Sequence, residues 1–268
     1  MTAETLSLAG KTALITGSGR ETGIGAAIAR VFARNGAAVA IHYVSESSKA
    51  RAEKVAADIS REFGTETTVV QGALEKASTS TKIVQETLEG LNADHIDILV
   101  NNAGYGSPTN LIEATPELLE AEFGINVFAT IYLTQAVIEI GKMPRGGRII
   151  NVGSIVSKLG LELSAVYAAA KAAQDSLTAS WAGQVSSLTQ TPILTGQTFS
   201  HNMAKEFLVA PDGSASELQT GMLAQTRAGS RIGTVNDMAD AALLLASEKS
   251  RWLTAQWISV SGGVTGTM

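Results

Sequence analysis

Tyr167 and Lys171 have the spacing and the chemistry of an acid–base pair. They lie in an alanine-rich segment, 164–188, whose periodicity predicts a helix, so residues four positions apart project from the same face. A fixed ammonium charge beside a phenol favours the phenolate and lowers the tyrosine pKa from its ordinary value near ~10. The bare pair by itself is more typical of an ordinary amphipathic helix, so its surroundings must decide.

Ser154 is a second candidate because of where it stands in the expected fold. It follows an apolar run, 148–152, that is typical of a buried strand. Open α/β sheets bind their ligands at the carboxyl ends of the strands, so this hydroxyl would lie where chemistry takes place. By itself, a serine at such a turn is a capping residue or a solvated hydroxyl.

A glycine-rich segment from Gly17 to Gly25 has the features of a phosphate loop. It joins the apolar run 12–16 to a segment of helical period. A glycine turn between a strand and a helix points backbone N–H groups and the positive end of the helix at a phosphate. A glycine motif alone fits a tight turn, but the strand before it and the helix after it favour dinucleotide binding.

The elements that must position these residues alternate along the whole chain. Short β-branched runs alternate with longer segments of helical period, which predicts an α/β fold: a Rossmann-like, doubly wound parallel sheet of about seven strands with helices on both faces. The expected strands are 12–16, 38–43, 67–71, 96–100, 148–152, 191–195 and 255–260. The expected helices are 23–35, 47–63, 79–91, 115–141, 164–188 and 236–247.

The chain is expected to form a single domain, 1–268, with one excursion. Residues 199–230 have weak periodicity and several glycines, so this segment is the candidate substrate lid. Elsewhere, Thr115 followed by Pro116 is a helix start signal, and Asn35-Gly36 is a helix stop signal.

Composition excludes several classes of protein. Lysine and arginine number 20 against 25 acidic residues, and they are scattered, which argues against a nucleic-acid surface. Without cysteine the chain has no disulfide or thiolate site, and its three histidines lack ligand spacing, so we expect no metal. The longest apolar stretch, 125–140, is interrupted by polar residues, and no leader pattern is present. A cytoplasmic protein without membrane contact is expected.

Taken in order, the motifs resemble those of the short-chain dehydrogenase/reductase family over nearly the whole chain. The glycine loop after Thr16 is similar to the family's T-G-x-x-x-G-x-G, lengthened by two residues. The sequence Asn-Asn-Ala-Gly at 101–104 is similar to the family's NNAG, and 231–263 resembles its last helix, last strand and closing glycines. The intervals from Asn126 to Ser154 and from Ser154 to Tyr167 also match the family.

This resemblance implies an oxidoreductase that transfers hydride from NADPH to a ketone or 3-oxoacyl carbonyl, giving a secondary alcohol. It implies four catalytic residues: Asn126, Ser154, Tyr167 and Lys171. Tyr167 would donate a proton to the carbonyl oxygen and Ser154 a hydrogen bond. Lys171 would bias Tyr167 and hold the nicotinamide ribose, and Asn126 would bind a water that passes protons to Lys171.

The resemblance also implies NADP(H) rather than NAD(H). An NAD enzyme needs a carboxylate at the end of the second strand, where Tyr43 stands, and Arg20 resembles the family arginine that faces the 2′-phosphate. Glu21 and Glu46 are signals against this assignment. The expected cofactor-binding residues are Gly17, Ser18, Gly19, Arg20, Gly23, Ile24, Gly25, Tyr43, Ser45, Leu74, Asn102, Ala103, Gly104, Tyr167, Lys171 and Thr198.

Two departures from the family keep an alternative open. Thr195 stands where many members have proline, and Ala73 stands where an aspartate near the adenine is common. Proteins of this fold include cyclases, isomerases, dehydratases and dinucleotide-sensing regulators, so non-redox chemistry is the alternative, and a purely structural module is a third class. The presence of all four catalytic residues favours the reductase.

The remaining expectations concern substrate and assembly. Apolar residues in the lid segment, including Phe199, Met203 and Met222, suggest a small hydrophobic carbonyl substrate, although they could equally pack on the protein's own core. The helices expected at 115–141 and 164–188 are apolar on more than one face. We therefore expect a homotetramer or a homodimer that buries the excess.

Overall fold

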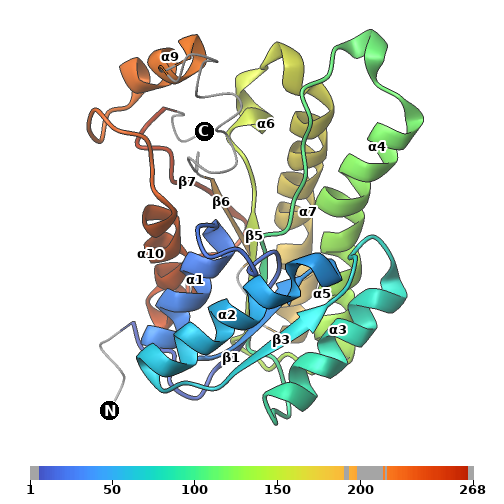
Figure 1. Cartoon of the computed structure of the whole chain (residues 1–268), viewed down its shortest axis with the longest axis vertical. Coiled ribbons are helices and arrows are strands. Elements are labelled where there is room, and N and C mark those ends of the chain that lie inside the picture. The colour runs from blue at the N-terminus through green and yellow to red at the C-terminus, as the bar shows by residue number, and fades with distance from the viewer. Residues whose placement is uncertain (1–5, 190–192, 198–213, 215, 265–268) are drawn as a thin grey trace.

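The computed structural model describes residues 6–189, 193–197, 214 and 216–264 (Figure 1). In this part of the chain, strands form one sheet in the order β3-β2-β1-β4-β5-β6-β7, and every neighbouring pair is parallel. The strands are β1 Thr12–Ile15, β2 Ala38–Tyr43, β3 Thr67–Gln71, β4 Ile98–Asn101, β5 Arg148–Val152, β6 Ile193–Gln197 and β7 Gln256–Ser259. The Rossmann-like α/β class predicted from the sequence is confirmed.

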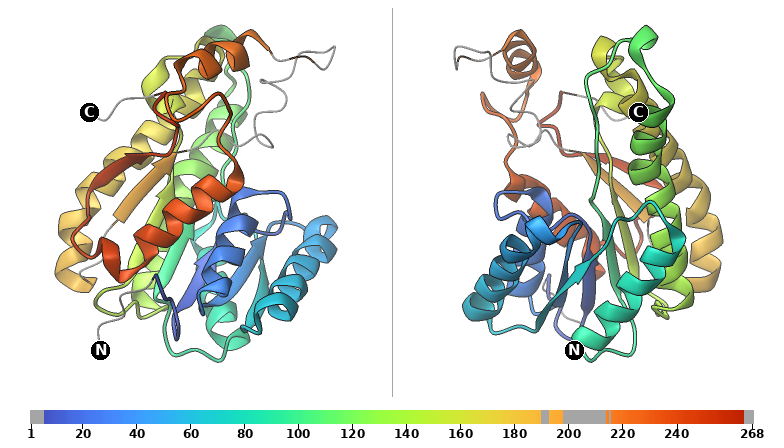
Figure 2. Two further views of the ribbon diagram at one scale, coloured as in Figure 1. Left: turned by 90° about the vertical axis from the view of Figure 1, so that its left-hand side faces the viewer. Right: turned by 45° about the vertical axis from the view of Figure 1, so that its right-hand side comes forward.

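Helices cover both faces of the sheet (Figure 2). The longer helices are α1 Ile24–Arg34, α2 Glu46–Phe63, α3 Ala77–Gly90, α4 Pro116–Phe123, α5 Ala129–Glu139, α7 Ala165–Thr189, α9 Glu217–Gln225 and α10 Val235–Ala246. Short turns are η1 Leu111–Glu113, η2 Gly124–Phe128, α6 Val156–Leu159, η3 Glu162–Ser164 and η4 Glu248–Ser250. Figure 1 shows α9 at the end of the molecule opposite the N-terminus.

Two apolar layers hold the helices against the sheet. On one face, side chains of α1, α2 and α10 pack together, with Phe32 and Ile59 fully buried. On the other face α3 and α5 contribute Ile83, Leu133 and Val137. The strands between the layers are buried on both sides, which explains why their sequences are continuous apolar runs without alternation.

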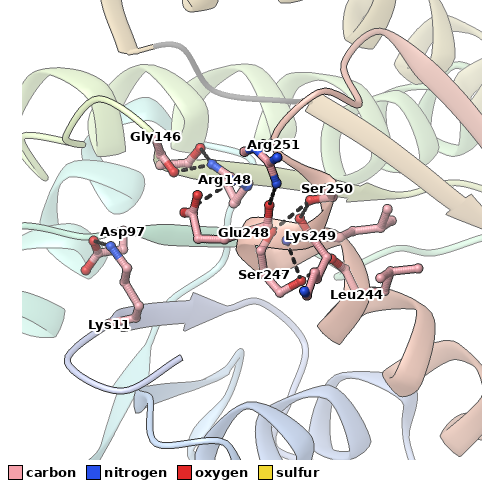
Figure 3. Close-up of polar contacts among 12 residues, drawn as sticks. Lys11, Asp97, Gly146, Arg148, Leu244, Ser247, Glu248, Lys249, Ser250 and Arg251 are labelled. Carbon is pink, nitrogen blue, oxygen red and sulfur yellow. Dashed lines mark hydrogen bonds and ion pairs between the residues drawn. The ribbon is translucent and has the colours of Figure 1, made fainter. Parts of the chain in front are cut away.

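The amino ends of the strands are fixed by ionic contacts (Figure 3). Asp97, just before β4, accepts hydrogen bonds from the Lys11 ammonium at 2.9 Å and from the backbone N–H of Thr12 at 2.9 Å. Arg148, at the start of β5, is buried and donates to the carbonyl oxygens of Gly146 and Gly147. These contacts lie at the edge of the sheet opposite the carboxyl ends of the strands, where the candidate site is expected.

One predicted helix is interrupted. The segment 115–141 was expected to be continuous, but it divides into α4, the π-helical turn η2 and α5. The predicted start holds, because Thr115 accepts a hydrogen bond from the backbone N–H of Leu118 and Pro116 is the first helical residue. Although Pro116–Glu139 is long and apolar enough to cross a membrane, 56% of its most apolar window is buried, as in a core helix.

His42, at the end of β2, fixes the carboxyl ends of β1, β2 and β3 together. Its Nδ1 accepts a hydrogen bond from the backbone N–H of Gly17 at 3.0 Å, so the proton of the neutral ring is on Nε2 and is donated to the carbonyl oxygen of Gly72 at 2.8 Å. Burial lowers the pKa of His42 from 6.5 to about 4. The role of His42 is therefore structural.

We predict that this ring makes folding sensitive to mild acid. Because the pKa of His42 is lowered on folding, its neutral form is fully compatible with the native state above pH 6.5, and stability falls as the pH drops toward 4. The free energy of unfolding should fall by about 2 kcal/mol from this site between pH 7 and pH 5. His42→Gln, which keeps a donor and an acceptor, should lack this decrease in urea titrations.

The matched control is His95→Gln, which removes a half-exposed imidazole at the other end of the sheet. It should retain the wild-type difference between the two pH values. A His42→Gln protein with the full wild-type loss of stability would contradict the assignment to His42.

Candidate active site

The candidate site lies at the carboxyl edge of the sheet, where the chain reverses its winding. The strand order places β1 beside β4, and the two halves of the sheet are built outward from this pair. In open α/β sheets ligands bind outside such a switch point. The glycine loop follows β1 and the Asn102–Gly104 segment follows β4, so the topology brings these two motifs together.

The glycine loop requires glycine at two positions for different reasons. Gly17 has a φ of +62°, in the left-handed region. Gly25, in the first turn of α1, has no room for a side chain: a Cβ there would lie 2.7 Å from the carbonyl oxygen of Gly17 and 2.7 Å from Nδ2 of Asn102. Gly23 is the N-cap of α1, so the positive end of the helix faces the loop.

Thr16 joins the two motifs. Its hydroxyl accepts hydrogen bonds from the backbone N–H groups of Asn102 and Ala103, both at 2.9 Å. The Asn102 amide donates to the carbonyl oxygens of Thr16 at 2.8 Å and Gly17 at 3.2 Å. The structure therefore brings the predicted phosphate loop against the predicted NNAG segment.

Tyr167 and Ser154 meet across the end of β5. The Tyr167 phenol lies close to the Ser154 hydroxyl, which is itself nearly buried. Burial raises the pKa of Tyr167 to about 12, the nearby Ser154 hydroxyl opposes the shift, and the negative charge of Glu122 adds to it. The phenol is therefore protonated at neutral pH, which is the form of a general acid.

The expected lowering of the Tyr167 pKa by Lys171 is not found. The Lys171 ammonium lies 5.9 Å from the centroid of the Tyr167 ring. It is directed instead toward the carbonyl oxygen of Val152, at 2.9 Å, and the amide oxygen of Gln174, at 3.2 Å. Desolvation of the phenol outweighs the distant charge, so the protein's own groups raise this pKa rather than lower it.

Lys171 is a buried amine with a lowered pKa. The side chain is only 2% exposed. Burial lowers the pKa of Lys171 to about 8, and the charge of Asp175 partly opposes the shift. An ammonium in this environment is retained only because two oxygen atoms accept its hydrogen bonds.

Asn126 lies in the π-helical turn η2 rather than in a regular helix. Its amide donates to the carbonyl oxygen of Tyr105 at 2.6 Å and to that of Glu122 at 2.8 Å. A Cβ added to Gly104 would lie 2.9 Å from Oδ1 of Asn126 and 3.5 Å from Nζ of Lys171, so both polar groups border this glycine. π-helical turns frequently accompany functional sites.

Sequence reasoning missed a chain of buried side chains that joins Lys171 to Asn126. The amide oxygen of Gln174 accepts from Lys171, and its amide nitrogen donates to the Thr130 hydroxyl at 2.9 Å. Thr130 in turn donates to the carbonyl oxygen of Asn126 at 3.1 Å. The signal was available, because Gln174 and Thr130 are polar residues on apolar helices, three and four positions after predicted catalytic residues.

The residues predicted to bind the adenosine end of the cofactor are less closely connected to one another. Arg20 is exposed in the loop, while Tyr43 is almost buried and its hydroxyl donates to Gln71 at 3.3 Å. Ser45 begins α2, and its hydroxyl lies 2.9 Å from that of Ser47. Leu74 and Ile24 are buried in the apolar clusters, so their side chains serve the core.

The two acidic residues that argue against NADP binding, Glu21 and Glu46, each have a lysine partner. Glu21 forms an ion pair with Lys54 on α2, and Glu46 lies 3.5 Å from the Lys49 ammonium. Their charges are therefore balanced by neighbouring side chains.

The predicted lid is only partly described. Residues 198–213 lie outside the described residues. They include the apolar Phe199, Met203, Phe207 and Leu208, and also Thr198 and Ser200. In the described part, Met222 on α9 packs against Ile155, the residue after Ser154. A pocket beside them is lined largely by apolar residues: Ile155, Met222, Leu223, Ile232, Val260 and Val264, with Gln219, Thr226, Arg231, Gly233 and Ser261.

Comparison with known proteins identifies the family. The family model described as enoyl-(acyl carrier protein) reductase matches residues 17–265 of the chain. The 3-oxoacyl-acyl-carrier-protein reductase FabG of Vibrio cholerae is 33% identical over 261 residues, covering 97% of this chain and 99% of the relative. The chain belongs to the short-chain dehydrogenase/reductase family.

Further relatives of this dehydrogenase/reductase are ketone-reducing enzymes by name. The L-xylo-3-hexulose reductase of Hypocrea jecorina is 31% identical over 295 residues, covering 95% of this chain and 96% of the relative. The crystal structure of landomycin C-6 ketoreductase LanV with bound NADP and rabelomycin superposes with a TM-score of 0.82 at 28% identity, covering 96% of this chain and 97% of that one.

We predict that Gln174 keeps the Lys171 ammonium charged. Gln174→Leu removes one of its two acceptors and leaves Thr130 without its donor, at a cost of about 1–3 kcal/mol in the free energy of unfolding. The pKa of Lys171 should fall below its present value of about 8. The alkaline limb of the pH profile of kcat/KM should therefore move to lower pH.

A control is Gln225→Leu, which removes an exposed amide on α9. It should leave this limb in place. An unchanged limb in a folded Gln174→Leu enzyme would show that Gln174 does not support the ammonium.

Proposed function

We propose that Tyr167, Ser154, Lys171 and Asn126 catalyse NADPH-dependent reduction of a carbonyl compound to a secondary alcohol. The observation that supports this most directly is the close approach of the Tyr167 phenol to the Ser154 hydroxyl at the carboxyl end of β5. Two hydroxyl groups near one another can both serve one carbonyl oxygen, as reduction of a carbonyl requires. The FabG and LanV relatives, by name, reduce ketone groups.

The chemistry divides between the cofactor and the chain. When bound, NADPH supplies a hydride to the carbonyl carbon, and negative charge develops on the carbonyl oxygen. Tyr167 donates its proton to that oxygen, since its pKa of about 12 keeps it protonated at neutral pH. Ser154 donates a hydrogen bond to the same oxygen and orients the phenol.

Lys171 and Asn126 support this pair from the buried side. The Lys171 ammonium, held by Val152 and Gln174, borders Gly104 together with Asn126. From this position Lys171 can hold the nicotinamide ribose hydroxyls. The buried chain of Gln174 and Thr130 joins the Lys171 ammonium to the main-chain carbonyl oxygen of Asn126, the residue to which the resemblance assigns a water.

The cofactor is NADP(H), and the chain's residues fit it. The loop from Gly17 to Gly25 offers backbone N–H groups and the start of α1 to the pyrophosphate. Arg20 is exposed beside this loop, and Ser45 and Ser47 present hydroxyls at the start of α2. These groups are suited to a 2′-phosphate, and the end of β2 carries Tyr43 in place of a carboxylate.

Several finer assignments belong to the same proposal. We assign one domain, 1–268, with 199–230 as its lid, and a hydrophobic substrate on the evidence of the pocket beside Ile155 and Met222. A cytoplasmic homotetramer or homodimer fits the chain, since Phe128 on η2 and Leu119 on α4 are exposed apolar side chains. Non-redox chemistry is the alternative, but it gives no reason for all four of Asn126, Ser154, Tyr167 and Lys171 to be present.

Replacing Tyr167 with phenylalanine tests the catalytic proposal. Tyr167→Phe keeps the ring and removes the proton donor, so kcat with an accepted ketone should fall by about 10² to 10⁴-fold while the Kd for NADPH is unchanged. The measurement is steady-state NADPH oxidation with a panel of ketones and 3-oxoacyl thioesters. Tyr132→Phe, on α5, is the matched control and should be as active as the wild type.

If Tyr167→Phe turns over its substrate at the wild-type rate, or if conversion proceeds without consumption of NADPH, the reductase proposal is wrong.

Replacing Arg20 tests the choice of cofactor. Arg20→Ala should raise the Kd for NADPH by about 10- to 100-fold, the loss of a charge-assisted hydrogen bond, and leave the Kd for NADH unchanged. Fluorescence titration measures both constants. Arg61→Ala, at the far end of α2, should change neither. An unaltered preference for NADPH would remove Arg20 from this role.

A further inference from the structure

Glu122 is a buried carboxyl group beside the site that no sequence motif marks. It lies on α4 one helical turn before Asn126 and has no exposed surface. Its Oε1 accepts a hydrogen bond from the backbone N–H of Ser107 at 2.7 Å. Its Oε2 is buried without a hydrogen-bond partner among the described residues. Burying a carboxyl group in this way is costly, so its position calls for a function.

Glu122 and Asn126 together hold one short backbone segment. Asn126 donates from its amide to the carbonyl oxygen of Tyr105 at 2.6 Å, and Glu122 accepts from the N–H of Ser107. The two bonds therefore lie on either side of Gly106. The Asn126 amide also donates to the main-chain oxygen of Glu122, at 2.8 Å. The two side chains that hold the segment are therefore fixed to each other within one helical turn.

Gly106 is in turn pressed against the catalytic tyrosine. A Cβ added to Gly106 would lie 2.6 Å from Cδ2 and 2.7 Å from Cγ of the Tyr167 ring. Only a glycine allows the backbone to approach the ring this closely. The place where the segment 105–107 is held thus limits the positions that the Tyr167 ring can take.

We propose that Glu122 is a positioning residue for Tyr167: its carboxyl oxygen holds Ser107, so that Gly106 supports the phenol ring beside Ser154. This inference rests on the proposed function, because it assumes that Tyr167 is the proton donor. Glu122 acts through the backbone of 105–107 and takes no part in the proton transfer itself.

The charge of Glu122 is a separable second effect. Burial raises the pKa of Glu122, and when ionised its charge raises the pKa of Tyr167. Other titratable groups of this region are Lys171 and Asp175 on α7, Lys158, which forms an ion pair with Asp175, and Glu75, whose side chain packs against Gly124. Glutamine at 122 would keep the acceptor for Ser107 and remove only the charge.

A pair of substitutions at 122 separates the two effects. Glu122→Gln should keep kcat for ketone reduction within about threefold of the wild type. Glu122→Ala should lower kcat by about 10- to 100-fold with little change in KM or in the Kd for NADPH, because a small displacement of a catalytic group slows the chemical step. Glu120→Ala, an exposed residue of the same helix, is the control and should match the wild type.

Two readouts distinguish positioning from a general loss of structure. Amide hydrogen exchange at Ser107 should be fast in Glu122→Ala and slow in Glu122→Gln. In the alcohol-oxidising direction, which needs the phenolate, Glu122→Gln should shift the rise of kcat/KM to lower pH, since an ionised neighbour no longer raises the pKa of Tyr167.

A double-substitution cycle tests whether the effect passes through Gly106. Gly106→Ala should lower kcat by displacing the ring, and the Glu122→Ala, Gly106→Ala double variant should be no slower than the slower single variant. Additive losses would overturn the proposal, as would a Glu122→Gln enzyme as slow as Glu122→Ala. Fast exchange at Ser107 with wild-type kcat would also overturn it, while leaving the role of Tyr167, tested by Tyr167→Phe, intact.

Discussion

The site depends on keeping one ammonium group inside the protein. Lys171 is almost completely buried, and its charge is stabilised by the carbonyl oxygen of Val152 on β5 and by the amide of Gln174. A buried charge without such partners would be lost by deprotonation or would destabilise the fold. Because Gln174 is bound in turn to Thr130, and Thr130 to Asn126, one requirement fixes α7, η2 and the end of β5 relative to each other.

The environment of the tyrosine sets its pKa. Desolvation raises the pKa of Tyr167 to about 12, and the nearby Ser154 hydroxyl offsets only part of the shift. A phenol with this pKa is protonated at neutral pH, and its service as a base would require additional positive charge near the ring. The shift in the pKa of Tyr167 therefore comes from the environment of the residue and not from its identity.

Much of this architecture could be read from the sequence. The strand runs are continuous because the sheet is covered on both faces, and the glycines at 17 and 25 are required by a left-handed turn and a close approach to Asn102. The Tyr167–Lys171 spacing placed both residues in one helix. The sequence-based prediction failed at 115–141, where a helical period taken over the whole segment does not resolve the single π-helical turn that carries Asn126.

What the sequence determined by itself is local: which segments are strands or helices, where the glycine loop lies, and which residue types could perform the chemistry. Tertiary structure alone decided what each of these groups touches. No sequence motif marks Gln174, Thr130 or Glu122. These residues join the site only when α4, α5 and α7 pack together. It also decided the direction of the Tyr167 pKa shift, since burial is a property of the folded neighbourhood, and two residues four apart on a helix carry no information about how much water surrounds them.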